Sequence, residues 1–278
     1  MVSSASILFM VITLLIALVL PLVLVLVLCI KKKIHIIPVL VGAGVFFLFQ
    51  MILRIPALQI AASISPKFQQ FVSSPILGGL FLGLTAGIFE EFGRYIGYKT
   101  LLKRRDAWRD GVAFGLGHGG IEAVLLVGLG YVNNLLYAMV INSGQWDAIA
   151  AVLPQETAQQ VYAGLVNTSA HMFLISGVER LFAMTVQIAL SILVLYGIRK
   201  RRFGYVLLAV GFHFVLDSPL ALLNKQVGIV GTELYIMLCA VAALVYILYS
   251  KKAFERLENT EQTVSPQPVL AESDAEEQ

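Results

Sequence analysis

Seven ionisable side chains lie inside long apolar stretches of the sequence, where charged groups are rare. They are Glu90, Glu91, Arg94, His118, Glu122, His213 and Asp217. A charged side chain at the centre of a bilayer costs roughly 2.5–3.5 kcal/mol on insertion scales, so such residues usually face the protein interior and serve a function. Carboxylates and imidazoles placed there can transfer protons, activate water or bind a metal ion. The set therefore predicts a chemical site within the membrane.

The two adjacent glutamates are predicted to have different roles. Neighbouring residues of a helix point about 100° apart, so Glu90 and Glu91 cannot face the same partner. Arg94 follows them by four and three residues and can pair with either carboxylate. We expect Glu90 to be the catalytic carboxylate and Glu91 to brace Arg94 or a neighbouring helix.

Two histidines each have a carboxylate four residues further along the chain. His118 precedes Glu122 and His213 precedes Asp217 by this spacing, which puts each pair on one helix face. A carboxylate so placed can fix the tautomer and orientation of an imidazole.

The three helices that carry these residues are expected to present them at one depth. At ~1.5 Å per residue, counting from the basic cluster at the end of each segment puts Glu90, His118 and His213 roughly 12–16 Å deep. We therefore expect one polar cluster in the cytoplasmic half of a helical bundle. Gly111, Gly115 and Gly119 repeat every four residues and predict that another helix packs closely beside His118.

The apolar stretches predict an all-α, polytopic transmembrane bundle. Hydrophobic residues make up 58% of the chain and charged residues 13%. Runs of about 20 apolar residues are typical of membrane-spanning helices. Strand-like alternation is missing. The net charge of +3 is small and the basic residues are concentrated in short loops, which argues against nucleic-acid binding. We predict about seven spans, near residues 5–30, 34–54, 75–98, 110–140, 174–198, 203–223 and 228–250.

Charge in the loops predicts the orientation. Basic clusters follow every second span, at 31–33, 99–109, 199–202 and 251–256. The positive-inside rule then places the N-terminus outside and the C-terminus in the cytoplasm.

The domain organisation follows from the same pattern. Residues 1–250 are expected to form the membrane domain, with an outer loop at about 142–173. Residues 251–278 are expected to be a disordered, acidic cytoplasmic tail. His171, Glu179 and Arg180 fall near the outer boundary, apart from the cluster, where a gate or a structural ion pair is expected.

Three motifs in this order resemble those of a known group of enzymes. They are Glu90-Glu91-x-x-Arg94, Phe114-x-x-x-His118 and His213-x-x-x-Asp217. This set resembles the glutamic intramembrane peptidases of the CAAX-protease and bacteriocin-processing type. The closest likeness is to the YhfC-type membrane peptidases of bacteria, and the PrsW-type proteases are more distant.

The resemblance implies an intramembrane endopeptidase of the bacterial cytoplasmic membrane. Its substrates would be membrane-associated proteins or peptides. Glu90, helped by His118, would activate a water for attack on a peptide carbonyl. His213, with Asp217 nearby, would stabilise the developing oxyanion. Phe114 and Glu122 are secondary candidates for the site.

A metal site can be built from nearly the same atoms. Glu90, His118 and His213 form a His/His/carboxylate set of the kind that holds catalytic zinc or another divalent metal. The zinc-protease motif HExxH is absent from the sequence, so we expect the metal-free mechanism and no cofactor.

Two further functions use the same residues. Glu, His and Arg within a membrane also serve proton-coupled transporters, although the sequence has no duplicated half. A non-catalytic membrane scaffold could keep the cluster as a structural ion pair.

Overall fold

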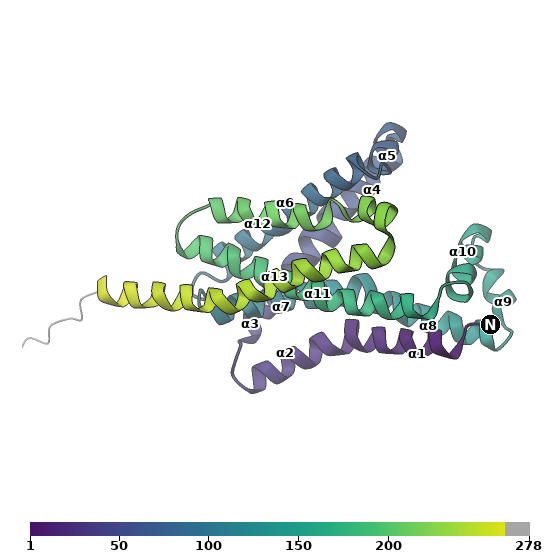
Figure 1. Cartoon of the computed structure of the whole chain (residues 1–278), viewed down its shortest axis with the longest axis horizontal. Helices are drawn as coiled ribbons and strands as arrows, with labels where there is room; N and C mark the ends of the chain where they lie inside the picture. The colour runs from purple at the N-terminus through teal and green to yellow at the C-terminus, as the bar shows by residue number, and fades with distance from the viewer. Residues whose placement is uncertain (265–278) are drawn as a thin grey trace, which may run out of the picture.

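The structure, a computed structural model, describes the backbone of residues 1–264 and the side chains of residues 1–260. Within this part the chain is helical and contains no strand, which confirms the all-α prediction (Figure 1). The first half contains α1 (Ser4–Leu14), η1 (Leu15–Val19), α2 (Leu20–Ile30), α3 (Ile36–Phe46), η2 (Phe47–Arg54), α4 (Ile55–Ile64), α5 (Pro66–Val72) and α6 (Leu77–Leu101). The second half contains α7 (Trp108–Ala123), η3 (Val124–Gly128), α8 (Leu129–Asn142), α9 (Trp146–Ala150), α10 (Gln155–Val166), α11 (Ala170–Arg199), α12 (Gly204–Asp217) and α13 (Leu220–Val264).

Three of the long helices contain a π-helical segment. η1, η2 and η3 each continue the preceding α-helix without a break, so α1 to α2, α3 to α4, and α7 to α8 are continuous rods. π-helical turns are rare and frequently occur at functional sites. η2 is the one that bears on the polar cluster, as described below.

Fewer helices have membrane-spanning length than the sequence predicted. Among the described residues, five helices are long and apolar enough to cross a membrane. A sixth span arises if α5 and α6, bent by 88°, are counted together. The predicted span at 203–223 is instead the 14-residue α12, which ends just before Ser218 and Pro219. The next helix, α13, is broken at Gly228, where φ is +68°.

The segment predicted as a disordered tail is partly helical. α13 continues through residues 251–264, while residues 265–278 lie outside the described part of the chain. Phe254 explains the difference, because it is 1% exposed and its ring centroid lies 5.6 Å from that of Tyr196. Burial of this aromatic ring anchors the helix to the end of α11.

The predicted outer loop contains the two short helices α9 and α10. Trp146 at the start of α9 packs edge to face on Tyr137 of α8, with ring centroids 5.9 Å apart. This contact ties the connection to the end of the bundle that lies away from the basic loops.

α7 lies at the centre of the bundle and packs between α3 and α11. The predicted glycine strip faces α11, since a Cβ at Gly115 would lie 2.4 Å from the Cα of Ile188. The sequence did not reveal that Gly117 faces α3. A Cβ at that position would lie 2.0 Å from the carbonyl oxygen of Val39. Both neighbours therefore touch the backbone of the helix that carries His118.

Substituting Gly117 by alanine should destabilise the protein by about 1–3 kcal/mol, because a backbone carbonyl cannot yield to the added methyl as a flexible side chain would. Thermal unfolding of the purified protein in detergent would measure the effect. Gly130→Ala is the matched control, since no atom lies within 4 Å of its added Cβ. Equal midpoints for both variants would show that α3 and α7 are not in backbone contact.

Candidate functional site

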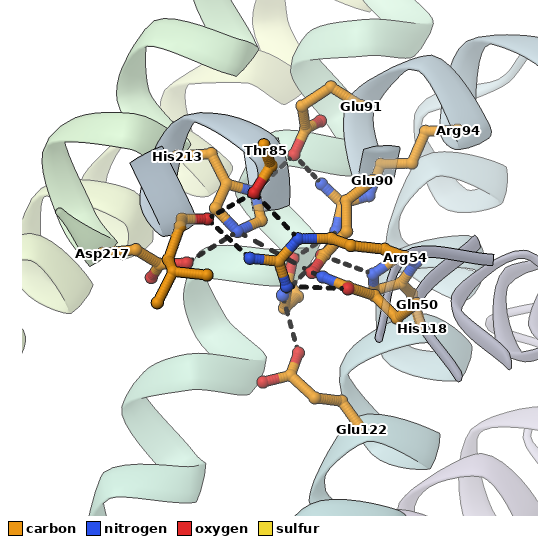
Figure 2. A network of polar contacts seen from close by, with 12 residues as sticks. Gln50, Arg54, Thr85, Glu90, Glu91, Arg94, His118, Glu122, His213 and Asp217 are labelled. Atoms are coloured by element: carbon orange, nitrogen blue, oxygen red, sulfur yellow. Dashed lines mark hydrogen bonds and ion pairs between the residues drawn. The ribbon is translucent and has the colours of Figure 1, made fainter. Parts of the chain in front are cut away.

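Glu90 is the centre of a buried polar network inside the helical bundle (Figure 2). It lies on α6, is 3% exposed and is hydrogen-bonded to four other side chains. His118 Nε2 lies 2.9 Å from its Oε2, which also accepts hydrogen bonds from Gln187 Nε2 at 3.1 Å and Arg94 Nη2 at 3.3 Å. Gln50 Nε2 donates to its Oε1. The carboxylate is thus held by groups from α6, α7, α11 and η2.

Glu91 and Arg94 form a second layer of the network. Both side chains are fully buried, and Arg94 donates to Glu91, to Glu90 and to Gln187. Glu91 also accepts a contact of 2.8 Å from Nδ1 of His213 on α12. The adjacent glutamates share Arg94, whereas only Glu90 contacts His118 and Gln187, and Glu91 has the shorter contact with His213.

His213 lies between two carboxylates. Its Nδ1 contacts Glu91, and its Nε2 lies 3.3 Å from Asp217 Oδ2 and 3.9 Å from Glu90 Oε1. The side chain of Asp217 is 33% exposed, whereas those of His213, Glu90 and Glu91 are at most 4% exposed. The cluster is therefore most open beside Asp217.

Glu122 takes a different position from the one predicted. We expected it to orient His118, but Glu90 is the carboxylate that contacts this imidazole, and Nδ1 of His118 has no hydrogen-bond partner in the described part of the chain. Glu122 instead accepts a 2.6 Å hydrogen bond from Gln187 Nε2. Gln187 thereby links the carboxylates of Glu90 and Glu122.

Arg180 is connected to the cluster, contrary to the prediction that it lies too far away. Its Nη1 lies 3.3 Å from Glu122 Oε1, and its Nη2 donates to Glu179. The prediction counted backbone depth alone. Arg180 and Gln187 are seven residues apart on one face of α11, so both reach the carboxylate of Glu122.

Sequence reasoning missed three polar residues of the site. Gln50, Arg54 and Gln187 contribute directly or through one neighbour to the contacts of Glu90. Arg54 donates to Gln50 Oε1 at 3.1 Å, and it anchors to α6 through Thr85 Oγ1 at 3.2 Å and the carbonyl oxygen of Leu82 at 2.6 Å. Arg54 is the last residue of the span predicted at 34–54, and its charge at that boundary gave no indication of a contact with the site. Gln50 and Gln187 could have been found as uncharged amides within apolar runs of the sequence.

Phe114 has a packing role around His118. Its ring stacks on Tyr98 with centroids 4.4 Å apart, and lies 6.4 Å from the imidazole of His118. Phe46 of α3 meets the same imidazole edge to face at 5.2 Å. These rings restrict the orientations open to His118.

The network contains a set of side chains that fits a metal ion. Glu90, His118 and Glu122 each offer one ligand atom, and these atoms all lie within 4.8 Å of one another. Imidazole nitrogen and carboxylate oxygen are ligands that zinc accepts in proteins. The predicted set had His213 in place of Glu122. His213 lies closer to Glu91 and Asp217, at 2.8 and 3.3 Å, than to Glu90, at 3.9 Å.

Comparison with known proteins places this arrangement in a family. The model of the family described as YhfC intramembrane metalloprotease matches residues 15–252, which include every residue of the network. The chain belongs to this family. The uncharacterised membrane protein YhfC of Bacillus subtilis (strain 168) is 32% identical over 226 residues, which cover 77% of this chain and 84% of that protein. No solved structure matches the chain.

Membership of the YhfC family confirms the resemblance seen in the three motifs and agrees with an integral membrane protein. It also indicates a protease in general terms. The relationship to CAAX-processing and PrsW-type enzymes stays a prediction.

Proposed function

We propose that this protein is an intramembrane endopeptidase that hydrolyses peptide bonds of membrane-associated proteins or peptides. The observation that carries the proposal is the 2.9 Å contact between the carboxylate of Glu90 and the imidazole of His118, inside a buried network. A carboxylate and an imidazole in contact can activate a water molecule for attack on a carbonyl carbon. The family description, intramembrane metalloprotease, supports the same reaction.

The proposal includes a divalent metal, which replaces our sequence-based preference for a metal-free mechanism. Glu90, His118 and Glu122 would hold the ion. When bound, such an ion polarises a carbonyl and makes its bound water a better nucleophile. The charges of the network favour a cation, because its carboxylates outnumber its guanidinium groups by two. The carboxylates are Glu90, Glu91, Glu122, Glu179 and Asp217, and the guanidinium groups are those of Arg54, Arg94 and Arg180.

Glu90 can serve in the reaction through both carboxylate oxygens. Oε2 faces His118, and Oε1 faces Gln50 and His213. One oxygen can act as a ligand while the other accepts the proton of the attacking water. The water oxygen then bonds to the peptide carbon, and the C–N bond breaks as the amine nitrogen takes up a proton.

His213 would stabilise the charge that develops on the peptide oxygen. Glu91 holds the ring through Nδ1, and Nε2 lies between Asp217 Oδ2 at 3.3 Å and Glu90 Oε1 at 3.9 Å, close to the proposed reaction centre. A donor held in this way lowers the energy of a tetrahedral oxyanion. Asp217, at the more exposed edge, would orient His213 and border the path of the substrate.

Metal removal tests the proposal. The purified protein is expected to contain about one divalent ion per chain and to cleave a membrane-tethered fluorogenic peptide. Chelation should lower cleavage by at least about a hundredfold, with restoration by zinc, because the attacking water loses its activation. Glu122→Gln should lower the metal content. Glu156→Gln, an exposed change on α10, should leave it unaltered.

Two results would contradict this part of the proposal. Full cleavage by metal-free protein would restore the metal-free mechanism at Glu90 and His118. Reconstituted vesicles that show substrate-dependent proton flux but no cleavage would favour a transporter.

Gln187→Leu is expected to weaken metal binding by about 10–100-fold, the usual effect of removing a group that orients metal ligands. Gln187 donates to both Glu90 and Glu122, and leucine leaves their oxygens without this shared donor. Competition with a metal-sensitive dye would measure the affinity. Gln160→Leu on exposed α10 is the control. An unchanged affinity for the metal in Gln187→Leu would argue against Glu122 as a ligand that Gln187 orients.

A further inference from the structure

An apolar cavity of about 560 Å³ lies between α11, α12 and α13, on the side of α12 away from Glu90. Its walls include Leu190 and Leu193 of α11, Leu208 and Phe212 of α12, and Ala243 and Tyr246 of α13. The volume falls in the range of small-molecule sites, roughly 300–1,000 Å³. Phe212 is 54% exposed, so the protein itself does not fill this face of α12.

One end of the cavity lies beside positive charge. Tyr196 and Tyr205 line this end, with ring centroids 5.2 Å apart. The ammonium of Lys200 lies 5.9 Å from the centroid of the Tyr196 ring. Arg202 is exposed in the turn between α11 and α12, and exposed Lys252 precedes the lining residue Ala253.

Three acidic side chains at this end of the bundle form ion pairs with other cations. Glu255 pairs with Lys251 at 3.9 Å, and Asp106 and Glu258 pair with Arg199 at 3.8 and 3.6 Å. Lys200, Arg202 and Lys252 are exposed and form no ion pair within the described residues, so they leave positive charge near the end of the cavity that Tyr196 lines.

We propose that this cavity binds an acyl chain of an anionic phospholipid, whose phosphate contacts Lys200, Arg202 and Lys252. Hydrocarbon is the ligand that apolar walls within a bilayer accept, and tyrosines typically lie at the level of lipid headgroups. Clusters of Lys and Arg at the membrane surface attract anionic lipids. The shape, the aromatic end and the charge thus select one class of molecule.

The bound chain would support the helix that carries His213. The opposite face of α12 packs tightly on α6, where a Cβ at Gly87 would lie 3.0 Å from the carbonyl oxygen of Val210. A lipid in the cavity would complete the packing of α12 from the other side.

Lipid titration of the purified full chain tests the proposal without an activity assay. Delipidated protein is titrated with phosphatidylglycerol or with phosphatidylcholine of equal chains, and bound lipid is counted by native mass spectrometry. We expect tighter binding of phosphatidylglycerol. The double variant Lys200→Ser with Lys252→Ser should weaken it by roughly tenfold. Lys31→Ser with Lys32→Ser removes the same charge at another exposed loop and should leave it unchanged.

Filling the cavity tests the apolar half of the site. Ala243→Phe should abolish binding of both lipids, and the lysine variants still decide the question if this one does not fold. Equal binding of the two lipids, or an equal effect of the control pair, would overturn the proposal. Displacement of the lipid by millimolar inorganic phosphate alone would show that the cations bind phosphate independently of the cavity, which would also overturn it.

Discussion

Replacing Glu90 by glutamine should lower the rate of peptide cleavage by about 10²–10⁴-fold, the range typical of losing a general base. Glutamine keeps the size of the side chain and one acceptor oxygen. It can neither take a proton from water nor act as an anionic ligand. Four neighbouring side chains hold this position, so the substitution changes the chemistry of the side chain rather than its place.

Cleavage of the membrane-tethered peptide, measured beside circular dichroism and thermal unfolding, separates a chemical defect from a folding defect. Glu156→Gln is the matched control, because this exposed glutamate of α10 lies outside the network. If the Glu90→Gln protein retains a tenth or more of the activity, the reaction takes place at another site.

Arg94→Met should destabilise the protein by about 3–5 kcal/mol, the usual cost of removing one partner from a buried ion pair. Among residues 1–260, Arg94 is the largest fully buried side chain, and it donates to Glu91, Glu90 and Gln187. Methionine nearly preserves the volume but leaves two buried carboxylates without their cation. The loss of stability is therefore electrostatic.

A double variant makes this prediction specific. Adding Glu91→Gln to Arg94→Met removes one of the uncompensated charges and should recover part of the lost stability, as expected for residues in contact. Chemical unfolding in mixed micelles would measure the free energy of unfolding of the two single variants and the double variant. Arg104→Met, at an exposed position, controls for loss of a surface charge. Additive effects of the two substitutions would argue against a direct Glu91–Arg94 pair.

Depth counting anticipated which charged residues meet, because the rise of a helix converts position in the chain into depth. Glu90, His118 and His213 come from three helices and do form one network. The count could not anticipate which side chain contacts which, since that depends on helix rotation and side-chain reach. Arg180 shows this: its backbone lies two turns from Gln187, yet its guanidinium reaches Glu122.

Neutral polar residues were the larger omission. Gln50 and Gln187 carry no charge, so they do not stand out in an apolar stretch of sequence. Both side chains are nevertheless buried and contact Glu90. Span counting failed for a related reason. An average over apolar residues does not register the break at Gly228 or the end of α12 before Pro219. Phe254, a single aromatic ring, was enough to extend a helix into the predicted tail.

The π-helical segment η2 makes the site sensitive to the number of residues in the chain as well as to their identity. An i→i+5 turn accommodates one more residue than an i→i+4 turn, and each residue turns a helix by about 100°. Gln50 and Arg54 lie in this segment, while α3 before it packs on α7. A relative with one residue fewer between Phe47 and Arg54 could keep every apolar residue in the membrane and still turn both polar side chains away from Glu90. Gaps in an alignment at this segment would therefore mark a change in the site.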